Sequence, residues 1–393
     1  MNGPISVALI GAGWVAEHAY APVLGQSGLQ LAGVYDLDES RARRLAALLG
    51  LPDSRCSLAA CLDAAVTGVI VCTPPHLHAA QLRQLLAAGK FVLCEKPVLR
   101  EQREIENIAS LGAVTGRVMG SATTRLRPDV ALLLSWVRQG RIGQLQRVQL
   151  GWWRARGVPQ PGSWRTDPAL CPDGVFEDLA PHLLDIAAAA LPGEPAHVVA
   201  ASFERRYGGA DRAARWFNAG SDAGYHAVDH AQALFETAGR VVVDVETCWT
   251  CETPGDLSIV RFEGSRGTAQ LRGLFGFSTA RRTPEQMCSL KIDGEVVERH
   301  AFPAGPRLQQ LAFGASLRWF GRLCAGEPCG VAGFADIAQV GLWMQAIRDA
   351  AHRSGAAERL SAIRRQPAMR SEGLDHRERC DPAGGRRSLV TVA

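Results

Sequence analysis

The first 120 residues alternate short apolar runs with amphipathic stretches. Four apolar runs have the length of buried strands: Ile5–Ile10, Leu29–Tyr35, Gly68–Cys72 and Phe91–Cys94. Helical spacing of apolar residues follows the first three runs, to about Leu24, over Glu39–Leu49 and over His78–Ala88. This alternation predicts a doubly wound parallel sheet, which binds ligands at the carboxyl ends of its strands.

The pattern changes after residue 120. Strand-like segments lie near Leu145–Trp153, Val198–Phe203, Ala231–Glu236, Val241–Cys248, Leu257–Glu263 and Leu290–Val297. Hairpin signals such as Ala238-Gly239 and Asp293-Gly294 join several of them, and helices are expected at about 174–191, 308–324 and 335–353. We predict a second, α/β domain on an open, mostly antiparallel sheet. The expected domains are residues 1–120 and 121–353, followed by an arginine-rich flexible tail at 354–393.

The composition is that of a folded enzyme or binding protein. Hydrophobic residues make up 47% of the 393 positions and charged residues 21%. The 43 basic and 39 acidic residues give a net charge of +4. Eight arginines against five acids in residues 354–393 supply +3 of it, so the body of the protein is nearly neutral. No nucleic-acid partner is expected, because that needs a clustered basic face.

The chain shows no signal for export or for a membrane. Its start, MNGPISVALIGAG, lacks the basic and long apolar regions of a signal peptide, and no stretch has about 18 uninterrupted apolar residues. We expect a cytoplasmic protein without a membrane partner. The 11 cysteines are scattered, and the close pair Cys248-x-x-Cys251 has no second pair to complete a zinc site. Buried reduced thiols are therefore expected.

A glycine motif joins the first predicted strand to the first predicted helix. It reads Gly11-x-Gly13-x-x-Ala16 and includes Trp14 and Val15. Glycines there let the backbone turn sharply and approach a pyrophosphate at the helix N-terminus, as in Rossmann folds. Asp36 ends the next strand, where a carboxylate accepts hydrogen bonds from ribose hydroxyls and repels a 2′-phosphate. NAD is therefore predicted over NADP, a preference that three nearby arginines keep moderate: Arg41, Arg43 and Arg44.

Lysine is rare in this chain. Of the 43 basic residues only Lys90, Lys96 and Lys291 are lysines. Lys96 stands in Glu95-Lys96-Pro97 at the end of a predicted strand, and an arginine cannot replace a titratable amine. This position hints at acid–base chemistry, whereas Lys90 is interpreted as a surface residue.

Taken in order, several motifs resemble the glucose–fructose oxidoreductase and inositol dehydrogenase family, often called Gfo/Idh/MocA. In the first domain they are Gly11-Ala12-Gly13, Asp36, Thr73-Pro74-Pro75-His76-Leu77-His78, Ala88-Gly89-Lys90-Phe91-Val92 and Cys94-Glu95-Lys96-Pro97. In the second they are Arg125-Leu126-Arg127-Pro128, Gly140-Arg141-Ile142-Gly143, Trp164-Arg165 and Gly174-x-x-x-Asp178-x-x-x-His182-x-x-Asp185. The resemblance covers about residues 5–350.

The resemblance implies a set of site residues. The catalytic candidates are Lys96, Asp178 and His182. The cofactor-binding candidates are Gly11, Gly13, Trp14, Val15, Asp36, Thr73, Pro74, His78, Glu95 and Lys96, and the substrate-binding candidates are Arg125, Trp164 and Arg165. Hydride removal from a carbinol carbon needs a base for the hydroxyl proton, and a neutral imidazole suits that near pH 7. Lys96 would hydrogen-bond the oxygen of the same substrate hydroxyl. Asp178 would orient the His182 ring or bind another substrate hydroxyl. No metal site is expected.

Two departures from the family pattern concern the predicted helix around His182. Pro172-Asp173-Gly174 stands where the family has a glycine triplet, and Ala180-Pro181 replaces Gly-x before the histidine. Because proline inside a helix costs about 3 kcal/mol, we predict that the helix starts near residue 180. Asp178 would then lie at the helix entry, and its alignment with His182 would be lost.

The resemblance implies an NAD-dependent dehydrogenase or reductase acting at a ring hydroxyl or ketone. The substrate would be a sugar, cyclitol or aminocyclitol, with an aminoglycoside or a nucleotide-activated sugar among the candidates. Two alternatives are a non-catalytic sensor of the dinucleotide and an enzyme that cycles a tightly bound cofactor between two sugars. A homodimer or homotetramer is expected, because Val241–Cys248 is interpreted as apolar on both faces of its sheet.

Overall fold

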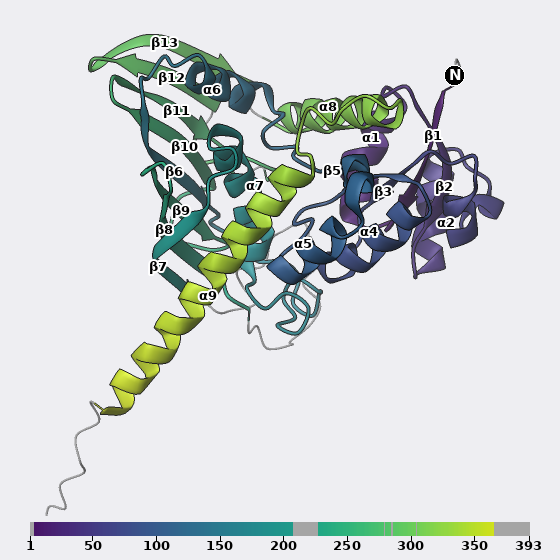
Figure 1. Cartoon of the computed structure of the whole chain (residues 1–393), viewed down its shortest axis with the longest axis horizontal. Coiled ribbons are helices and arrows are strands. Elements are labelled where there is room, and N and C mark those ends of the chain that lie inside the picture. Colours follow the sequence, from purple (N-terminus) through teal and green to yellow (C-terminus); the bar gives the residue numbers. More distant parts are fainter. Residues whose placement is uncertain (1–3, 207–226, 279, 284–285, 304, 365–393) are drawn as a thin grey trace, which may run out of the picture. The chain divides into compact units, whose positions relative to one another are not determined.

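The computed structural model describes residues 4–206, 227–278, 280–283, 286–303 and 305–364, with backbone alone for 355–364. The chain divides into two units, residues 1–355 and 356–393. The first unit contains two β-sheets and the helices that pack on them (Figure 1).

The N-terminal sheet is parallel, as predicted. Its strands are β1 (Ile5–Ile10), β2 (Leu29–Tyr35), β3 (Gly68–Val71), β4 (Phe91–Cys94) and β5 (Val118–Gly120), in the order β2-β1-β3-β4-β5. The α-helices are α1 (Ala21–Leu24), which continues the π-helical turn η1 (Ala16–Tyr20), α2 (Glu39–Leu48), α3 (Leu58–Leu62), α4 (His78–Ala87) and α5 (Gln102–Ala109). Short 3-10 turns are η2 (Asp53–Arg55), η3 (Pro75–Leu77) and η4 (Gly112–Arg117). The central strands are buried on both faces, which explains their continuous apolar runs.

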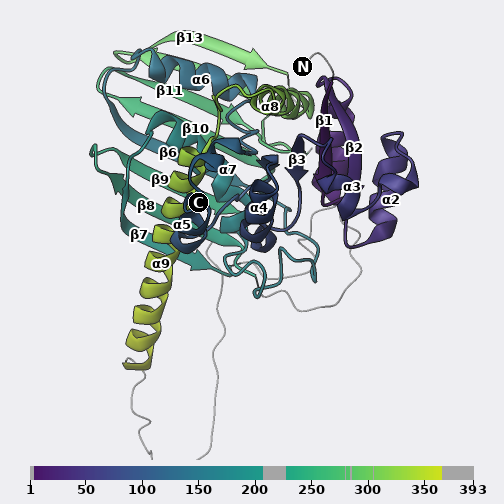
Figure 2. The same ribbon diagram turned by 45° about the vertical axis from the view of Figure 1, so that its right-hand side comes forward.

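Helix α8 (Arg307–Cys324) lies late in the chain but packs on the N-terminal sheet. Its Leu317 and Phe320 belong to one buried cluster with Leu9 and Ile70. At Gly68 an added Cβ would lie 2.7 Å from the Phe320 ring, so the close approach of α8 to β3 requires glycine. Figure 2 shows α8 next to β1 and β3.

The C-terminal sheet is open and mostly antiparallel, as predicted. Its strands are β6 (Leu145–Trp153), β7 (Ala196–Glu204), β8 (His230–Thr237), β9 (Val242–Cys248), β10 (Leu257–Gly264), β11 (Gly267–Gly273), β12 (Gln286–Ile292) and β13 (Glu295–Phe302). The order is β13-β12-β11-β10-β6-β9-β8-β7, and the pair β6–β9 is parallel.

Two features of this sheet differ from the prediction. The hairpin signal at Asp293-Gly294 is confirmed, so the single predicted strand Leu290–Val297 is divided between β12 and β13: Asp293 (φ 50°) and Gly294 (φ 89°) take the left-handed backbone of a tight turn. Strand β11 was not predicted. It begins and ends with glycine and has polar residues at alternate positions, so it lacks an apolar run.

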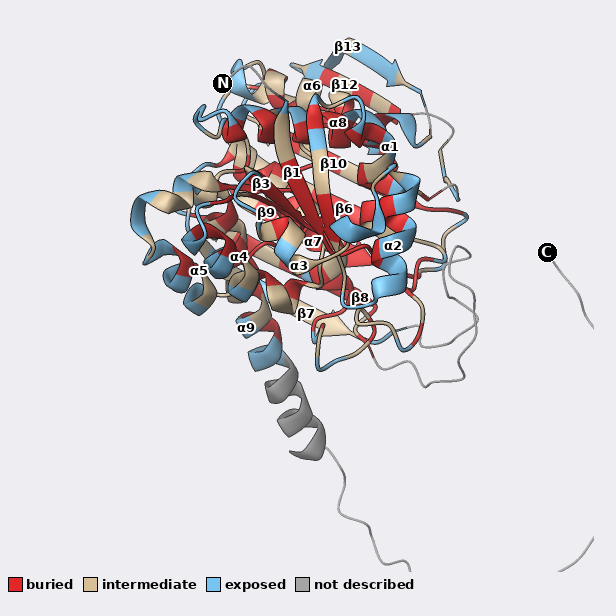
Figure 3. Cartoon of the chain, turned by 90° about the vertical axis from the view of Figure 1, so that its right-hand side faces the viewer, coloured by how far each residue is buried: buried red, intermediate tan, exposed pale blue. Residues whose placement is uncertain are grey.

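Helices cover one face of the C-terminal sheet. They are α6 (Pro128–Arg138), α7 (Val175–Ala190) and the part of α9 (Phe334–Arg364) that belongs to the first unit, whose core residues extend to Ala351. Between them and the sheet lies a core that includes Leu183, Phe235, Phe262 and Trp343. Figure 3 shows this buried layer in red, with exposed positions on the helix surfaces.

Helix α7 corrects the prediction that it starts near residue 180. It begins at Val175, so Pro181 lies inside it, and Asp178 and His182 stand one turn apart. Gly174 takes φ 49° before the first turn, and an added Cβ would lie 2.2 Å from the Val228 carbonyl oxygen. Burial of most of the helix offsets the free-energy cost of Pro181. This burial depends on residues far away in the chain, so no local sequence pattern could show it.

Strand β9 corrects the interpretation that Val241–Cys248 is apolar on both faces. Val243 and Val245 face the helices and are buried, whereas Asp244 and Glu246 lie on the opposite face. The outer face of the sheet is therefore charged at this strand.

The predicted tail begins with helix. Helix α9 extends to Arg364, and residues 365–393 lie outside the described part of the chain. Across the residues that the structure describes, no helix has the length and hydropathy to cross a bilayer.

Candidate active site

The glycine turn has the geometry that a dinucleotide requires. Gly11 has φ 95°, and an added Cβ would lie 2.7 Å from the Cys72 backbone, so this glycine is needed for packing against the end of β3. Gly13 instead faces open space, with no atom within 4 Å of an added Cβ. The backbone there is accessible to a ligand, as a pyrophosphate-binding turn requires.

Asp36 follows β2 directly and closes the turn. Its Oδ2 accepts a hydrogen bond from the Ala12 N–H at 2.7 Å, and its Oδ1 accepts one from the Asp38 N–H at 2.9 Å. This partly exposed carboxylate thus stands beside the glycine turn, where the sequence places the ribose contact.

Lys96 leaves the end of β4 and reaches α7. Its Nζ donates to the Asp178 carbonyl oxygen at 2.6 Å and to Asp178 Oδ1 at 3.3 Å. Lys90, interpreted as a surface residue, is instead buried, and its Nζ donates to the carbonyl oxygens of Asp63 and Val66, both at 2.7 Å. The two lysines therefore differ. Lys90 binds backbone carbonyls in the interior, whereas Lys96 reaches the Asp178 carboxylate in a cavity.

Asp178 is held as a carboxylate. Burial by itself would raise its pKa, but the positive charge of Lys96 and of two arginines holds the pKa well below its ordinary value. Oδ2 accepts a hydrogen bond from Trp249 Nε1 at 3.0 Å, and Oδ1 lies 3.6 Å from Arg165 Nε. This aspartate is therefore ionised at neutral pH.

His182 is held neutral. Burial lowers its pKa well below the ordinary value, and the positive charge of Lys96 lowers it further. Nδ1 hydrogen-bonds Thr124 Oγ1 at 2.9 Å, and the ring packs at a tilt on Trp152 with centroids 5.6 Å apart. A neutral, oriented imidazole is the form that can accept a proton.

These groups line one cavity of about 280 Å³, which is close to the size of common ligand pockets. It brings together eleven of the predicted site residues: Gly13, Trp14, Val15, Thr73, Pro74, Glu95, Lys96, Trp164, Arg165, Asp178 and His182. Glu95 also serves the structure, because its Oε1 accepts from Tyr20 at 2.8 Å and from Ser121 at 2.7 Å. The cavity extends from the glycine turn to α7.

The structure also brings in residues that the sequence did not single out. Arg154 lines the cavity with its guanidinium 5.8 Å from the centre of the Trp152 ring. Trp249 holds Asp178, and Arg165 stacks on Trp164 at 4.5 Å. Arg154 and Trp249 directly follow the neighbouring strands β6 and β9, and none of the motifs that resemble the family includes them.

Four predicted site residues are not part of the cavity lining: Gly11 and Asp36, described above, and His78 and Arg125. His78 is buried, and its ring nitrogens lie 2.8 Å from the carbonyl oxygens of Thr73 and Pro97, so it joins two loops that border the cavity. Burial lowers its pKa to about 4. Arg125 forms ion pairs with Asp185 and Asp336, which occupy the guanidinium.

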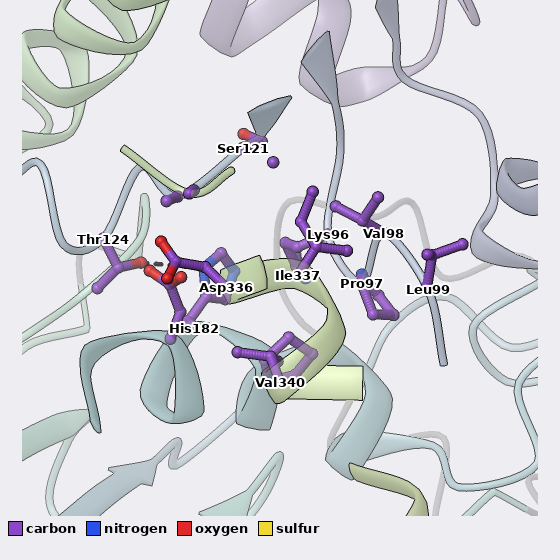
Figure 4. Close-up of a pocket in the computed structure, with 15 residues that line it drawn as sticks. Lys96, Pro97, Val98, Leu99, Ser121, Thr124, His182, Asp336, Ile337 and Val340 are labelled. Atoms are coloured by element: carbon purple, nitrogen blue, oxygen red, sulfur yellow. Dashed lines mark hydrogen bonds between the residues drawn. The ribbon is translucent and has the colours of Figure 1, made fainter. Parts of the chain in front are cut away.

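A smaller pocket of about 40 Å³ lies behind the catalytic candidates (Figure 4). Lys96, Thr124 and His182 line it together with Asp336 from α9, and the dashed line in Figure 4 marks the Thr124–His182 hydrogen bond. The volume is enough for a water molecule.

A parallel sheet with a glycine turn, and a cavity that joins this turn to ionisable residues of the second domain, are typical of NAD(P)-dependent oxidoreductases that act on CH–OH groups. Residues 5–122 match the model of the oxidoreductase family with an NAD-binding Rossmann fold. Residues 130–270 match the model of the GFO/IDH/MocA C-terminal domain. The chain belongs to the Gfo/Idh/MocA oxidoreductase family.

Individual relatives support this assignment. The chain is 31% identical over 294 residues to an Amycolatopsis mediterranei protein provisionally named UDP-kanosamine synthase oxidoreductase subunit, covering 74% of this chain and 81% of that protein. It is 26% identical over 193 residues to inositol 2-dehydrogenase of Rhizobium meliloti, covering 49% of this chain and 56% of that protein. The 3-ketoreductase KijD10 from Actinomadura kijaniata has the same fold, with a TM-score of 0.69 and 21% identity. The match covers 88% of this chain and 98% of KijD10.

Proposed function

We propose that the protein transfers hydride between NAD and a ring hydroxyl or ketone of a sugar or cyclitol, with Lys96, Asp178 and His182 as its catalytic set. The observation that supports this most is the cavity shared by these three residues and the open backbone at Gly13. The nicotinamide ring, when bound, supplies the hydride acceptor or donor.

The proposed roles follow from the hydrogen bonds. With an Nδ1 proton donated to Thr124, the Nε2 atom of His182 is left to take the substrate hydroxyl proton. A lysine ammonium has three donors, and Asp178 accepts two of them. The third N–H of Lys96 is available to the substrate oxygen, where it stabilises developing negative charge.

A turnover assay tests the function directly. Purified protein is incubated with NAD and a panel of nucleotide sugars, free sugars, cyclitols and aminoglycosides, and the formation of NADH is measured. Turnover with at least one sugar or cyclitol is expected. NAD binding without turnover on the whole panel would favour the non-catalytic sensor. Cofactor that copurifies with the protein and does not exchange would favour cycling between two sugars.

The charges of the cavity favour a nucleotide-linked sugar over an aminoglycoside. Lys96, Arg154 and Arg165 are positive, against the carboxylates of Asp178 and Glu95. A polycationic aminoglycoside would be repelled, whereas a diphosphate or other anion would be attracted. The relative named for UDP-kanosamine synthase, and KijD10 in its complex with TDP-benzene and NADP, support the same choice.

Replacing Arg165 with glutamine should reduce selectivity for charged substrates. A hydrogen bond to a charged group contributes about 1.5–3 kcal/mol, so kcat/KM for a nucleotide sugar should fall roughly 10–100-fold more than for a neutral sugar. Arg240→Gln is the matched control, because that side chain is 85% exposed in the turn between β8 and β9. An equal loss for both substrates would remove Arg165 from substrate selection.

We also propose NAD as the preferred cofactor. Asp36 stands beside the glycine turn, and the three arginines that could bind a 2′-phosphate each lie next to a carboxylate: Arg41 to Asp38 at 3.2 Å, Arg43 to Glu39 at 3.1 Å and Arg44 to Glu17 at 3.4 Å. Solved structures of this fold contain either cofactor, with NADP in KijD10 and NAD in GenD2 from gentamicin A biosynthesis.

Replacing Asp36 with alanine should narrow the preference for NAD, because the variant loses the carboxylate that repels a 2′-phosphate. The ratio of the NADP and NAD dissociation constants is the measurement. Asp53→Ala, on the same domain but away from the glycine turn, should leave the ratio unchanged. Tighter binding of NADP than NAD by the unmutated protein would show that the neighbouring arginines dominate.

Finally, we propose that the outer face of the C-terminal sheet pairs two copies of the chain. Cross-strand partners share a face. The register makes that face net basic on β10–β12, with Arg261, Arg272 and Lys291 against the single acid Glu263. It makes the face net acidic on β8–β9, with Glu236, Asp244 and Glu246, while Arg147 on β6 between them forms an ion pair with Asp244. A two-fold axis lets the basic half of one copy face the acidic half of the other.

Light scattering at micromolar concentration should show a dimer or tetramer. Arg272→Glu places an acid in the basic half and should increase the monomer fraction. Arg103→Glu on α5, at an 89% exposed side chain, should not. A monomeric unmutated protein would refute the pairing.

A further inference from the structure

The small pocket of about 40 Å³ shares a wall with the large cavity. Lys96, Thr124 and His182 line both of them, so these three side chains separate the reacting centre from the space behind it. Apolar residues of the loop after β4 and of α9, such as Leu99 and Val340, line much of the rest (Figure 4). The volume exceeds the roughly 10–15 Å³ that one water molecule needs. The few polar groups of the lining therefore decide whether water enters.

Thr124 contributes a hydroxyl group to this lining. The residue is 2% exposed, and its Oγ1 lies 2.9 Å from His182 Nδ1. When Nδ1 donates its proton to this oxygen, the hydroxyl proton needs an acceptor of its own. Among the residues that the structure describes, none accepts it. A buried donor without a partner is costly, and a water molecule in the small pocket supplies the acceptor.

Two carboxylates also line the small pocket. Asp185 of α7 and Asp336, in the first turn of α9, both bind the guanidinium of Arg125. Asp185 uses both of its oxygens in this way, whereas Asp336 accepts from Arg125 Nη1 only at Oδ2, at 2.8 Å. No described residue donates a hydrogen bond to Oδ1 of Asp336. Because the Asp336 side chain is 29% exposed, it connects the small pocket to solvent.

The proposed reaction needs a route by which a proton leaves the site. Oxidation of a hydroxyl to a ketone releases one proton for each hydride, and His182 receives this proton at Nε2. The imidazolium would stand beside the ammonium group of Lys96, and both burial and that charge lower the pKa of the ring. With cofactor and substrate bound, water is excluded from the large cavity. The side of Nδ1, behind the ring, is then the route that remains.

We propose that Thr124, a water molecule in the small pocket and Asp336 form a relay that carries a proton from His182 to solvent. The Nδ1–H bond of the imidazolium breaks as Thr124 Oγ1 takes that proton, and the proton of the hydroxyl passes to the water. The water passes a proton to Asp336 Oδ1, and the carboxyl group releases it to solvent. One proton thus leaves for each hydride transferred. The ring is left with its proton on Nε2, and exchange with water after product release restores the Nδ1–H form.

Two substitutions test the relay in the full chain. Thr124→Val keeps the shape of the side chain but removes the hydroxyl, and Asp336→Asn can still accept from Arg125 but cannot take up a proton. Each should lower kcat by up to about 10²-fold, the lower end of what positioned proton transfer contributes. Thr124→Ser should recover most of the turnover. Asp349→Asn is the matched control, because Asp349 is an exposed acid on the same helix, and it should leave turnover unchanged.

A solvent isotope effect distinguishes proton transfer from a structural role. In heavy water, kcat of Asp336→Asn should fall by a larger factor than kcat of the unmutated protein, because proton release then limits turnover. The isotope effect of Asp349→Asn should equal that of the unmutated protein. A lower kcat in Asp336→Asn with an unchanged isotope effect would overturn the relay and leave Asp336 as a partner of Arg125 only.

The relay can also be measured without substrate. In protein with isotope-labelled histidine and bound NADH, NMR gives the rate at which the Nδ1 proton of His182 exchanges with solvent, and His182→Ala identifies the resonance. Asp336→Asn should slow this exchange several-fold. The effect on kcat rests on the proposed function, but the exchange rate does not. Slowed exchange in a protein that turns over no sugar would refute the dehydrogenase and leave the relay in place, whereas turnover with unchanged exchange would overturn the relay.

Discussion

Replacing His182 with alanine should lower turnover by roughly 10²–10⁴-fold, the usual contribution of a general base. The imidazole is held neutral and oriented by Thr124, so its loss removes the group that accepts the substrate proton. NADH binding should be nearly normal, because the proposed contacts of the nucleotide are with the glycine turn and Asp36 and do not include His182. His300→Ala, on an exposed edge strand, is the matched control for removing an imidazole.

The pH dependence sharpens this prediction. The pKa of His182 in the folded protein lies well below its ordinary value of about 6.5, so the base stays neutral below pH 6.5 and kcat/KM should persist there. In the unfolded chain the same ring takes up a proton near pH 6.5. Folding stability should therefore fall as the pH drops below that value, and it should fall less in His182→Ala. Two results together would contradict the assignment of His182 as the general base. In the unmutated protein, kcat/KM would fall as the pH is lowered, with a midpoint at pH 6.5 or above, and His182→Ala would leave turnover unchanged.

Replacing Lys96 with arginine should cause a comparably severe loss of turnover with near-normal NADH binding. The substitution keeps the positive charge but removes a titratable amine and enlarges the head group. The ammonium donates to both the backbone and the carboxylate of Asp178, a fit that a planar guanidinium does not reproduce. A purely electrostatic role would survive in part, whereas proton sharing on the substrate oxygen would fail.

Lys291→Arg is the matched control, because this lysine lies on the exposed outer side of β12. It should leave turnover unchanged. Rates like those of the unmutated protein in Lys96→Arg would remove the lysine from the catalytic set and revive the interpretation as a dinucleotide sensor.

Local patterns in the sequence determined most of the first domain. Continuous apolar runs such as Ile5–Ile10 are needed wherever both faces of a strand are buried, and a turn such as Gly11–Gly13 requires glycine whatever lies elsewhere. The ordered motifs, spread over about residues 5–350, also identified the family, and the resemblance implies Lys96, Asp178 and His182 as site residues. The apolar runs, the glycine turn and each single motif depend on residues close together in the chain.

Only the tertiary structure decided the features that depend on distant residues. Pro181 is tolerated inside α7 because the helix is buried on neighbouring elements. Likewise, the partners of Asp178 include Trp249, 71 residues away. Packing energy and through-space charge outweigh local preference at such positions, and neither is written in the spacing of residues along the chain.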